Sequence, residues 1–459
     1  MPPIDFKVQD LAQLDRERFT GYKSSLDFYN GIQWEQTARG RQLVFNYAKL
    51  AVDKITSYLM NDINYAFEPL PGGDPVQAKA CEDMIYTTLD LNNAQELDYT
   101  TEVDTAILGD GCYKVTWDPI LKQIRITSPD VNGIFAWWKG DDLNQTYRVV
   151  SRYQLSSDEI FSLYKKSIAK KSAFITEYWT DTEFRLYLDN DVIDKKPNPY
   201  GFIPFVIFPN MCKPKQFWGV SDVPALIQSQ KELNRAMSQL SRILEVSGNP
   251  IAVIEGADSS EGIQVAPGAV WVLPPDTKAY LLDFLQGGGI RLHIDYIDLI
   301  YRTMHDVSEI PRAAFGGFSA QMSGVALQVE LQSLLQKVHR KRLIRTNVYK
   351  RRNMLIMKLW AKFGGADYTL NTTQRVLWGQ VLPQDKSGEA QQEQLLIQSG
   401  VHSRRTAMDN LGVRDANLEW EKWKEERQQI LQQNNDFKAQ STQGGARARN
   451  FAQDMIPVL

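Results

Sequence analysis

The sequence SDVPALIQSQKELNRAMSQLSRILEV, residues 221–246, decides the fold of this chain. Ser221 and Asp222 are typical helix-capping residues and Pro224 suits a first helical turn, so the stretch predicts a helix that ends at the Gly-Asn-Pro that follows. Its apolar residues recur every three or four positions, with Gln230 in a gap, which indicates one apolar stripe. The residues of that stripe are Leu226, Leu233, Met237, Leu240 and Leu244.

A second amphipathic helix follows after a β-rich excursion. Residues 251–285 contain two runs typical of strands, 251–254 and 269–273, with a Pro-Gly turn before the second run and a Pro-Pro turn after it. After three consecutive glycines the helical spacing returns and stops before Pro311. The sequence therefore predicts two helices that bracket a small β cap. The apolar residues of the second helix are Ile290, Ile294, Ile297, Tyr301 and Met304.

A third helix is predicted from 323 to 363, after a loop of small residues at 311–324. Its length of about forty residues far exceeds the mean of about 11–12, so we expect support from outside the monomer. The helix has many bases and no acid after 331, which allows two interpretations: a DNA-facing stripe, or pairing with acids of a neighbouring subunit and burial of the side-chain stems in the same domain. The bases surround much of the helix, which favours the second interpretation.

The flanking parts mix helices and antiparallel strands, so the predicted fold class is α+β and mainly helical. Helices are expected at 41–60, 76–90, 94–108, 387–399, 403–411 and 417–432. Strands are expected at 112–117, 123–127, 147–153, 173–179, 184–188, 205–208 and 374–380. The polar end, 436–459, is predicted to be disordered on its own.

Composition excludes several classes of protein. The net charge is -3 and the charged fraction is 23%, which fits an ordinary folded protein and not a basic domain that holds DNA tightly. The three cysteines have no metal-ligand or disulfide spacing, which suits a reducing cytosol. No signal core or long apolar run is seen, so neither secretion nor a membrane span is expected.

No catalytic motif stands out, so we predict no enzyme, no catalytic residue, no metal and no cofactor. The four histidines lack ligand spacing, and the phosphate-loop and nucleophile-elbow patterns are missing. Gly109-Asp110-Gly111 suits either a catalytic acid in a turn or the entry to a hairpin. A rival hypothesis is a metal-dependent nuclease whose acids Asp104, Asp110 and Asp118 converge only in the fold.

The order and spacing of several short motifs resemble the portal proteins of tailed double-stranded DNA bacteriophages, in particular the long-tailed type. The resemblance covers nearly the whole chain. The motifs are Phe28-Tyr-Asn-Gly-Ile-Gln-Trp34, Asn46-Tyr-Ala-Lys49, Trp218-Gly-Val-Ser-Asp222, Gln230-Lys-Glu-Leu-Asn234, Asn249-Pro250, Pro267-Gly268, Glu309-Ile-Pro-Arg312 and Ser323-Gly324.

The resemblance implies a ring of about twelve subunits, or about thirteen when isolated, at one capsid vertex of the virion. The expected partners are the terminase large subunit, major capsid and scaffolding proteins, tail adaptor proteins and non-specifically bound double-stranded DNA, with assembly in the host cytoplasm. In the family's terms the chain divides into a wing (1–218), a first stem helix (219–248), a clip (249–286), a second stem helix (287–310), a tunnel loop (311–323), a long helix with the rest of the wing (324–385), a crown (386–435) and a tail (436–459).

The same resemblance suggests site residues. The tunnel loop would bring Arg312, Phe315, Phe318, Gln321 and Met322 to the DNA; the alternative is an ordinary linker between helices that packs on the neighbouring subunit, with its two phenylalanines as anchors. On the long helix, Lys337, Arg340, Lys341 and Arg345 would face DNA or a neighbouring subunit. The clip would offer partners an acidic rim of Glu255, Asp258, Glu261 and Asp276, unless these are plain solvated turns. A rival function is sequence-independent nucleic-acid binding through the basic helix 337–362.

Overall fold

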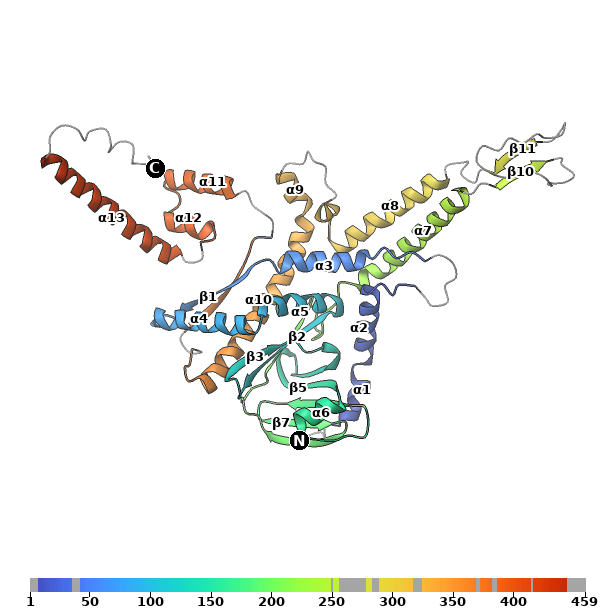
Figure 1. The fold of residues 1–459 in the computed structure, drawn as a ribbon, viewed down its shortest axis with the longest axis horizontal. Coiled ribbons are helices and arrows are strands. Elements are labelled where there is room, and N and C mark those ends of the chain that lie inside the picture. The colour runs from blue at the N-terminus through green and yellow to red at the C-terminus, as the bar shows by residue number, and fades with distance from the viewer. Residues whose placement is uncertain are drawn as a thin grey trace. The chain divides into compact units, whose positions relative to one another are not determined.

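The computed structural model describes residues 7–34, 42–248, 251–255, 278–282, 289–316, 324–368, 372–381, 386–413 and 416–443 (Figure 1). The chain divides into two compact units, Met1–Gly379 and Gln380–Leu459. Helices dominate the described residues, and the paired strands form antiparallel sheets of two to five members. The predicted fold class, α+β and mainly helical, is confirmed.

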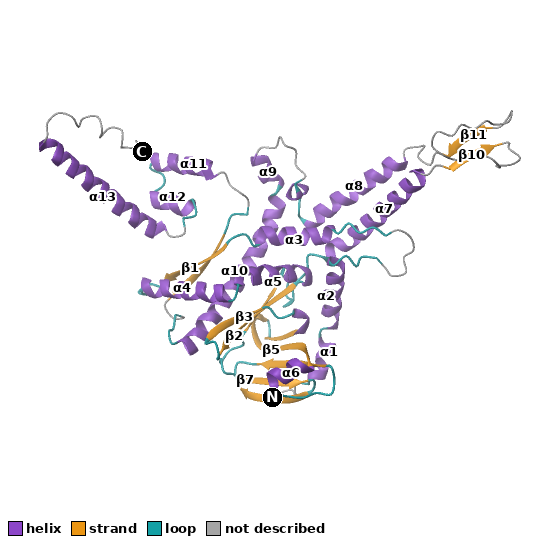
Figure 2. Ribbon diagram, in the orientation of Figure 1, coloured by secondary structure: helices purple, strands orange, loops and turns teal. Residues whose placement is uncertain are grey.

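An antiparallel meander of five strands forms the largest sheet of the first unit (Figure 2). Alternate residues of a strand share one face, so Ile134 and Ala136 of one strand enter the same buried cluster as Ala173 and Ile175 of another. The predicted strands in β5, β6 and β7 are confirmed, whereas β4 and the charged, exposed edge strand β8 were not predicted. The members are β4 (Ile134–Lys139), β5 (Asp142–Ser156), β6 (Ser172–Trp179), β7 (Glu183–Leu188) and β8 (Asp191–Pro197), and helix α6 (Ser157–Tyr164) follows β5.

The predicted hairpin is the centre of a three-stranded sheet in the order β3-β2-β9. Strand β2 (Asp110–Asp118) pairs with β3 (Gln123–Thr127) so that Val115 opposes Ile126. Strand β9 (Phe205–Pro209) pairs with the other edge of β2. Both the hairpin and the strand at 205–208 are confirmed.

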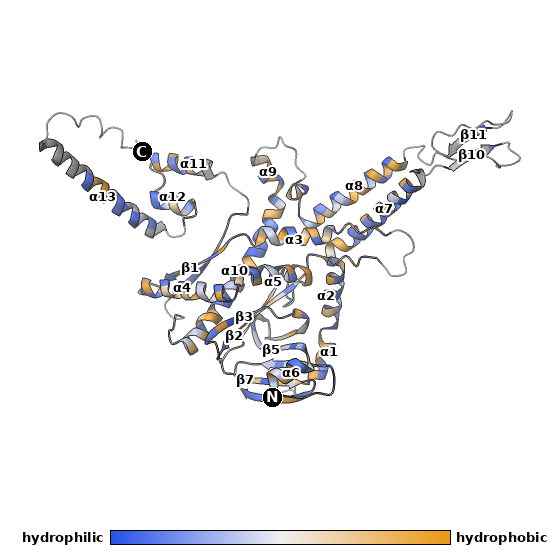
Figure 3. Cartoon of the chain, viewed as in Figure 1, coloured by the Kyte–Doolittle hydropathy of each residue, from blue (hydrophilic) through white to orange (hydrophobic). Residues whose placement is uncertain are grey.

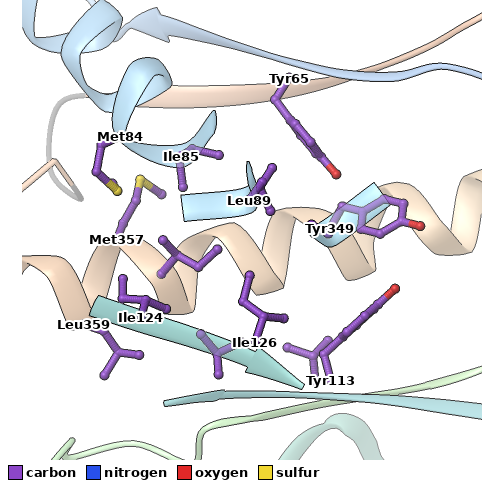
Figure 4. Close-up of a cluster of buried hydrophobic side chains, with 14 of the residues drawn as sticks. Tyr65, Met84, Ile85, Leu89, Tyr113, Ile124, Ile126, Tyr349, Met357 and Leu359 are labelled. Atoms are coloured by element: carbon purple, nitrogen blue, oxygen red, sulfur yellow. The ribbon is translucent and has the colours of Figure 1, made fainter. Parts of the chain in front are cut away.

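The main hydrophobic core joins segments that are far apart in the sequence. Strand β1 (Ile63–Pro69), which was not predicted, pairs with the predicted strand β12 (Thr372–Trp378). Against this pair and the three-stranded sheet pack α4 (Pro75–Leu91), α5 (Ala94–Leu108) and the long helix described next. Figure 4 shows side chains of this core, among them Tyr65, Met84, Ile85, Leu89, Tyr113, Ile124, Ile126, Tyr349, Met357 and Leu359.

The predicted third helix is present in extent but is not continuous. Helix α9 (Gly324–Glu330) ends at a turn residue, Leu331, and α10 (Gln332–Leu359) continues from there into a π-helical turn, η4 (Trp360–Gly364). Helix α10 contacts β2, β9, β12, α3 and α4. Its length is therefore supported largely by the same chain, and the expectation that a helix this long must be supported from outside the monomer is wrong for α10.

The two amphipathic helices are α7 (Pro224–Gly248) and α8 (Gly289–Ser308), which we call the stem. They pack on each other through Leu233, Ala236, Ile300 and Met304. Pro224 begins α7 as predicted, but Asp222 is not its cap, because lysines bind its carboxylate. Strands β10 (Ile251–Glu255) and β11 (Lys278–Leu282) pair antiparallel beyond the stem; the predicted strand 269–273 lies outside the described residues.

The amino-terminal helices are shorter than predicted. Helix α3 (Tyr47–Leu59) is capped by Asn46, whose side chain accepts a hydrogen bond from the Lys49 amide at 3.2 Å. Residues 42–46 are irregular instead of helical, because α7 takes up backbone hydrogen bonds of this segment, as described below. The other elements before α3 are η1 (Val8–Asp10), α1 (Leu11–Leu14) and α2 (Arg16–Tyr29).

The second unit contains three helices among its described residues, α11 (Lys386–Gln398), α12 (Arg404–Asn410) and α13 (Ala416–Gln443). They match the three predicted helices. Helix α13 continues past 436, so the prediction of a disordered tail is wrong for residues 436–443. That stretch contains neither proline nor glycine, and glycines follow directly at Gly444 and Gly445.

Candidate functional site

The candidate site is a polar cluster at the base of the stem, which we call the stem root. It consists of Glu102 on α5, Asn210 after β9, Asp222 before α7, and Lys337, Lys341 and Arg345 on α10. The three bases follow one another at intervals of four residues, so they share one face of α10. Three segments that are remote in the sequence supply the partners.

Two lysines of α10 hold the stem. The Lys341 ammonium donates to Asp222 and to the Asn210 side-chain oxygen, each at 2.6 Å. Lys337 lies 3.1 Å from the other Asp222 oxygen and donates to the Ser308 carbonyl at 3.0 Å. Asp222 precedes α7 and Ser308 ends α8, so one helix binds the start of the first stem helix and the end of the second.

Arg345 connects the cluster to α5 and to the end of β9. Its guanidinium binds both Glu102 oxygens, at 2.7 and 2.8 Å, and donates to the Pro209 and Asn210 carbonyls. Such a two-pronged pair fixes geometry as well as charge. The stem root is therefore tied to α5 and to the end of β9.

Burial gives these contacts their strength. The Lys341 side chain is 0% exposed and that of Asp222 is 6% exposed. Burial by itself would raise the pKa of Asp222, but Lys341 and Lys337 outweigh it and hold that pKa well below its usual range. The Asp222 carboxylate is therefore ionised at neutral pH.

The structure contradicts the DNA- or neighbour-facing orientation suggested for three of these bases and agrees with the other interpretation from the sequence, burial in the same domain. Lys337, Lys341 and Arg345 are buried and bind groups of their own chain, so they face neither DNA nor a neighbour. Arg340 is partly exposed and pairs with Glu309. Further along, Arg352 is buried against Asp98. Several bases of helix 337–362 are therefore not available to nucleic acid, which weakens the hypothesis that this helix is a nucleic-acid-binding surface.

Asp110 binds the segment that leads from β9 into α7, next to the stem root. One oxygen accepts a hydrogen bond from the Gly219 amide at 2.8 Å and the other accepts the Tyr22 hydroxyl. Gly109 has a φ of +102° and Gly219 lies directly on it: a β-carbon on Gly219 would come within 2.5 Å of the Gly109 carbonyl oxygen. The Gly109-Asp110-Gly111 motif thus holds the chain as it enters α7.

This placement argues against the nuclease hypothesis. Asp110 and Asp118 stand at opposite ends of β2, which at about 3.3 Å per residue puts them roughly 26 Å apart. The Asp118 carboxylate accepts the turn amides of Ile120 and Leu121. Within the described ranges no group of three or more His, Cys, Asp or Glu residues could hold a metal ion.

The other side of α7 binds an irregular segment that we call the strap, residues 31–34 and 42–48. Gln230 accepts from the Tyr47 amide at 3.0 Å and donates to the Phe45 carbonyl at 2.6 Å. Asn234 accepts from the Phe45 amide at 3.0 Å and donates to Gln33 at 2.6 Å. These side chains replace the partners that a helix would give the strap backbone.

Within the strap itself, the Trp34 indole donates to the Leu43 carbonyl at 3.1 Å, and the Gln33 amide donates to Asn46 at 3.0 Å. Sequence reasoning missed the partners of Gln230, Glu102 and Asp110. The only signal for one of them was the polar Gln230 inside an apolar stripe.

Replacing Gln230 with leucine is expected to lower the free energy of unfolding by about 2 kcal/mol, because buried backbone groups of the strap lose their partners. The measurement is urea unfolding of the full chain, followed by tryptophan fluorescence. Gln239→Leu, on the exposed face of the same helix, is the control and should change stability by less than about 0.5 kcal/mol. Equal effects of both substitutions would contradict the role of Gln230.

Two of the five predicted tunnel-loop residues are described. Arg312 is exposed and its guanidinium lies 5.7 Å from the Tyr301 ring centroid. Phe315 is half-buried, with its ring centroid 5.4 Å from that of His305, at a small cavity also lined by Tyr47 and Leu226. Phe315 therefore packs on its own chain. It is an anchor, as in the linker alternative, but its partners are not on a neighbouring subunit. Phe318, Gln321 and Met322 lie outside the described residues.

One predicted clip residue is described. Glu255, at the end of β10, is exposed and accepts a hydrogen bond from the Tyr280 hydroxyl of β11 at 2.8 Å. Asp258, Glu261 and Asp276 lie outside the described residues. The acidic rim therefore remains a prediction.

One flank of α8 is apolar and exposed, and we call it the α8 stripe. Leu292 is 72% exposed and Leu299 is 60% exposed, and Tyr296 and Val307 belong to the same flank. Hydrophobic and hydrophilic residues alternate around both stem helices (Figure 3). The stripe lies about 80° around α8 from Ile300 and Met304, which face α7. Tyr296 touches α7 through its hydroxyl, which donates a hydrogen bond to Glu232 at 2.9 Å, and is still 42% exposed.

The long paired helices, the small strand pair between them and the buried root define an α+β protein with a two-helix stem. A family model described as phage portal protein, SPP1 Gp6-like, matches residues 11–433, and the chain belongs to that family. Nothing among the curated proteins compared matches the chain. The predicted resemblance to phage portal proteins is confirmed.

Membership of the portal family makes the chain a structural component of the phage virion and of an oligomeric assembly at the capsid vertex. None of the helices in the described part of the chain has the length and apolar character that a membrane crossing requires.

Proposed function

We propose that copies of this chain form a ring-shaped channel at one capsid vertex, through which the phage genome is packaged and later ejected. The ring would contain about twelve subunits, or about thirteen when isolated. It would dock the terminase large subunit during packaging and tail adaptor proteins afterwards, and would meet capsid and scaffolding proteins during assembly in the host cytoplasm.

The observation that carries the proposal is the α8 stripe. Four large side chains on one flank of a stem helix are exposed while the neighbouring flank is packed on α7. Exposed apolar surface of this extent marks a protein interface. A contact between two different faces of identical chains closes into a ring when the rotation divides a full turn.

The stem root supports the mechanical side of the proposal. Helix α10 binds the chain before α7 and the end of α8 through buried charges, so a force on the stem is carried into the core that α10 shares with β2 and β9. A ring that transmits DNA needs subunits that resist shear, and buried ion pairs are costly to break.

The parts of the chain take these roles in the proposal. Residues 1–218 with 324–385 form the wing, 219–248 and 287–310 the stem, 249–286 the clip, 311–323 the tunnel loop and 386–435 the crown. Of the tunnel loop, Arg312 is the described side chain that is free to approach DNA, by its exposure. The clip would meet the motor and the tail adaptors through its acidic residues.

The test is the mass of the purified full chain. Native mass spectrometry and negative-stain electron microscopy are expected to show closed rings of about twelve or thirteen subunits with a central hole. A homogeneous monomer at every concentration up to that of an assembly reaction would overturn the proposal.

A further inference from the structure

We propose that the α8 stripe of one copy packs against the strap of the next copy. This inference rests on the proposed ring and names the two surfaces that build it. One surface is the flank of α8 with Leu292, Tyr296, Leu299 and Val307; the other is the strap, whose exposed apolar side chains are Ile32 and Val44.

The strap has the properties of a docking surface. Ile32 is 64% exposed and Val44 is 40% exposed, although both belong to a segment that is held firmly in place. Side chains of α7 and the bonds of Trp34 and Gln33 bind its backbone and hold its two halves together. Because the surface is ordered before binding, little conformational entropy is lost when a partner arrives.

The two surfaces lie on different faces of the stem. Around α7, the residues that bind the strap, Gln230, Asn234 and Ser238, lie about 130° from Leu233 and Ala236, which face α8. The end of the strap reaches α8, where the ring centroid of Tyr47 lies 5.0 Å from that of Tyr301. Tyr301 is about 160° around α8 from the stripe. Neither surface covers the other within one copy.

A second copy is the occupant that these features fit. Stripe and strap are both apolar, both exposed and present once in each chain, so a rotation can bring the stripe of one copy to the strap of the next. Contact between different faces continues from copy to copy, unlike a two-fold contact, which stops at a dimer. Burial of the four stripe residues removes exposed apolar surface of the stem from water.

Crosslinking in assembled rings tests the contact. Cys81 and Cys112 are buried and Cys212 is exposed, so Cys212→Ser provides the background. In it, Leu299→Cys together with Val44→Cys is treated with a short bis-maleimide. The expected result on a denaturing gel is a ladder from dimer up to the full ring, and either cysteine alone should give monomer.

The matched control is Arg291→Cys with Val44→Cys, because Arg291 is exposed on the polar face of the same helix. If rings form and crosslink through the control pair but not through Leu299→Cys, the stripe–strap contact is wrong and the proposed ring still stands. Crosslinking by Leu299→Cys alone, stopping at dimers, would show a two-fold contact and overturn it too. If the unmodified chain forms no rings, the proposed function itself fails.

A second measurement does not depend on crosslinker reach. Leu299→Gln is expected to raise the protein concentration at which half the chains are in rings by at least about tenfold, since a central apolar residue contributes much of the binding energy. Arg291→Gln should leave that concentration unchanged. Equal midpoints for the two variants, with both folded by circular dichroism, would contradict the proposal.

Discussion

Replacing Asp222 with asparagine is expected to lower the free energy of unfolding by about 3–5 kcal/mol, the range for a buried ion pair that loses one partner. The substitution leaves the Lys341 ammonium buried with Asn210 as its close neighbour and removes the charge that also faces Lys337. The measurement is the urea midpoint of the full chain, with tryptophan fluorescence as the signal.

Two further variants separate this effect from a general loss of charge. Asp298→Asn removes a carboxylate from an exposed pair with Arg302, and such pairs contribute at most about 1 kcal/mol. Asp222→Asn combined with Lys341→Met removes both charges and should cost less than Asp222→Asn alone. A double variant less stable than the single one would contradict the buried pair.

The pH dependence gives an independent readout of the same pair. The folded state holds the pKa of Asp222 below its usual range, so the folded chain binds this proton less readily than the unfolded chain. The stabilisation is fully present above the unfolded-state pKa of about 3.9 and is lost as the pH falls towards the folded-state value. Asp222→Asn should therefore flatten this acid limb and leave the curve above about pH 5 parallel to that of the unmodified chain.

Replacing Gly219 with alanine is expected to destabilise the chain by about 3 kcal/mol, the upper part of the range for overpacking. The new methyl group would lie 2.5 Å from the Gly109 carbonyl oxygen and 2.6 Å from the Pro209 side chain. Backbone cannot move aside as a flexible side chain does, so the chain entering α7 must shift and the Gly219 bond to Asp110 weakens.

Gly21→Ala is the matched control, because a methyl group at Gly21 would meet no atom within 4 Å. Gly21 lies inside α2, where alanine is favoured over glycine by about 1 kcal/mol, so this variant should be slightly more stable. Thermal unfolding of both variants decides the matter. An unchanged melting temperature for Gly219→Ala would show that the approach of Gly219 to Gly109 is not tight.

Much of the architecture could be predicted because it is local. The spacing in 221–246 and 290–304 predicts both stem helices, and alternation predicts the hairpin of β2 and β3. Helix ends were less secure: α3 begins at Asn46, later than the periodicity indicates, because α7 side chains compete for the backbone of the strap. A local sequence pattern cannot show this competition, because α7 and the strap are far apart in the sequence.

The stem root was also hard to predict, because its contacts join segments that are far apart in the sequence. From the sequence, the bases of α10 could face DNA, pair with a neighbour's acids or be buried in the same domain, and Lys341 and Arg345 are among the most deeply buried side chains. Their partners, Asp222 and Glu102, are more than a hundred residues away, and no periodicity links them. Asp110 was considered as a catalytic acid, yet it holds the Gly219 amide.

The sequence by itself determined the fold class, the two stem helices, the strand β10 that follows the first of them and the membership of a structural family, because short-range periodicity, turn chemistry and motif order carry that information; β11 was not predicted. Only the tertiary structure decided which charges are buried together and which apolar flank stays exposed. The reason is physical: burial and pairing depend on what the rest of the chain brings to a residue, and Lys341 has its meaning only once Asp222 and Asn210 surround it.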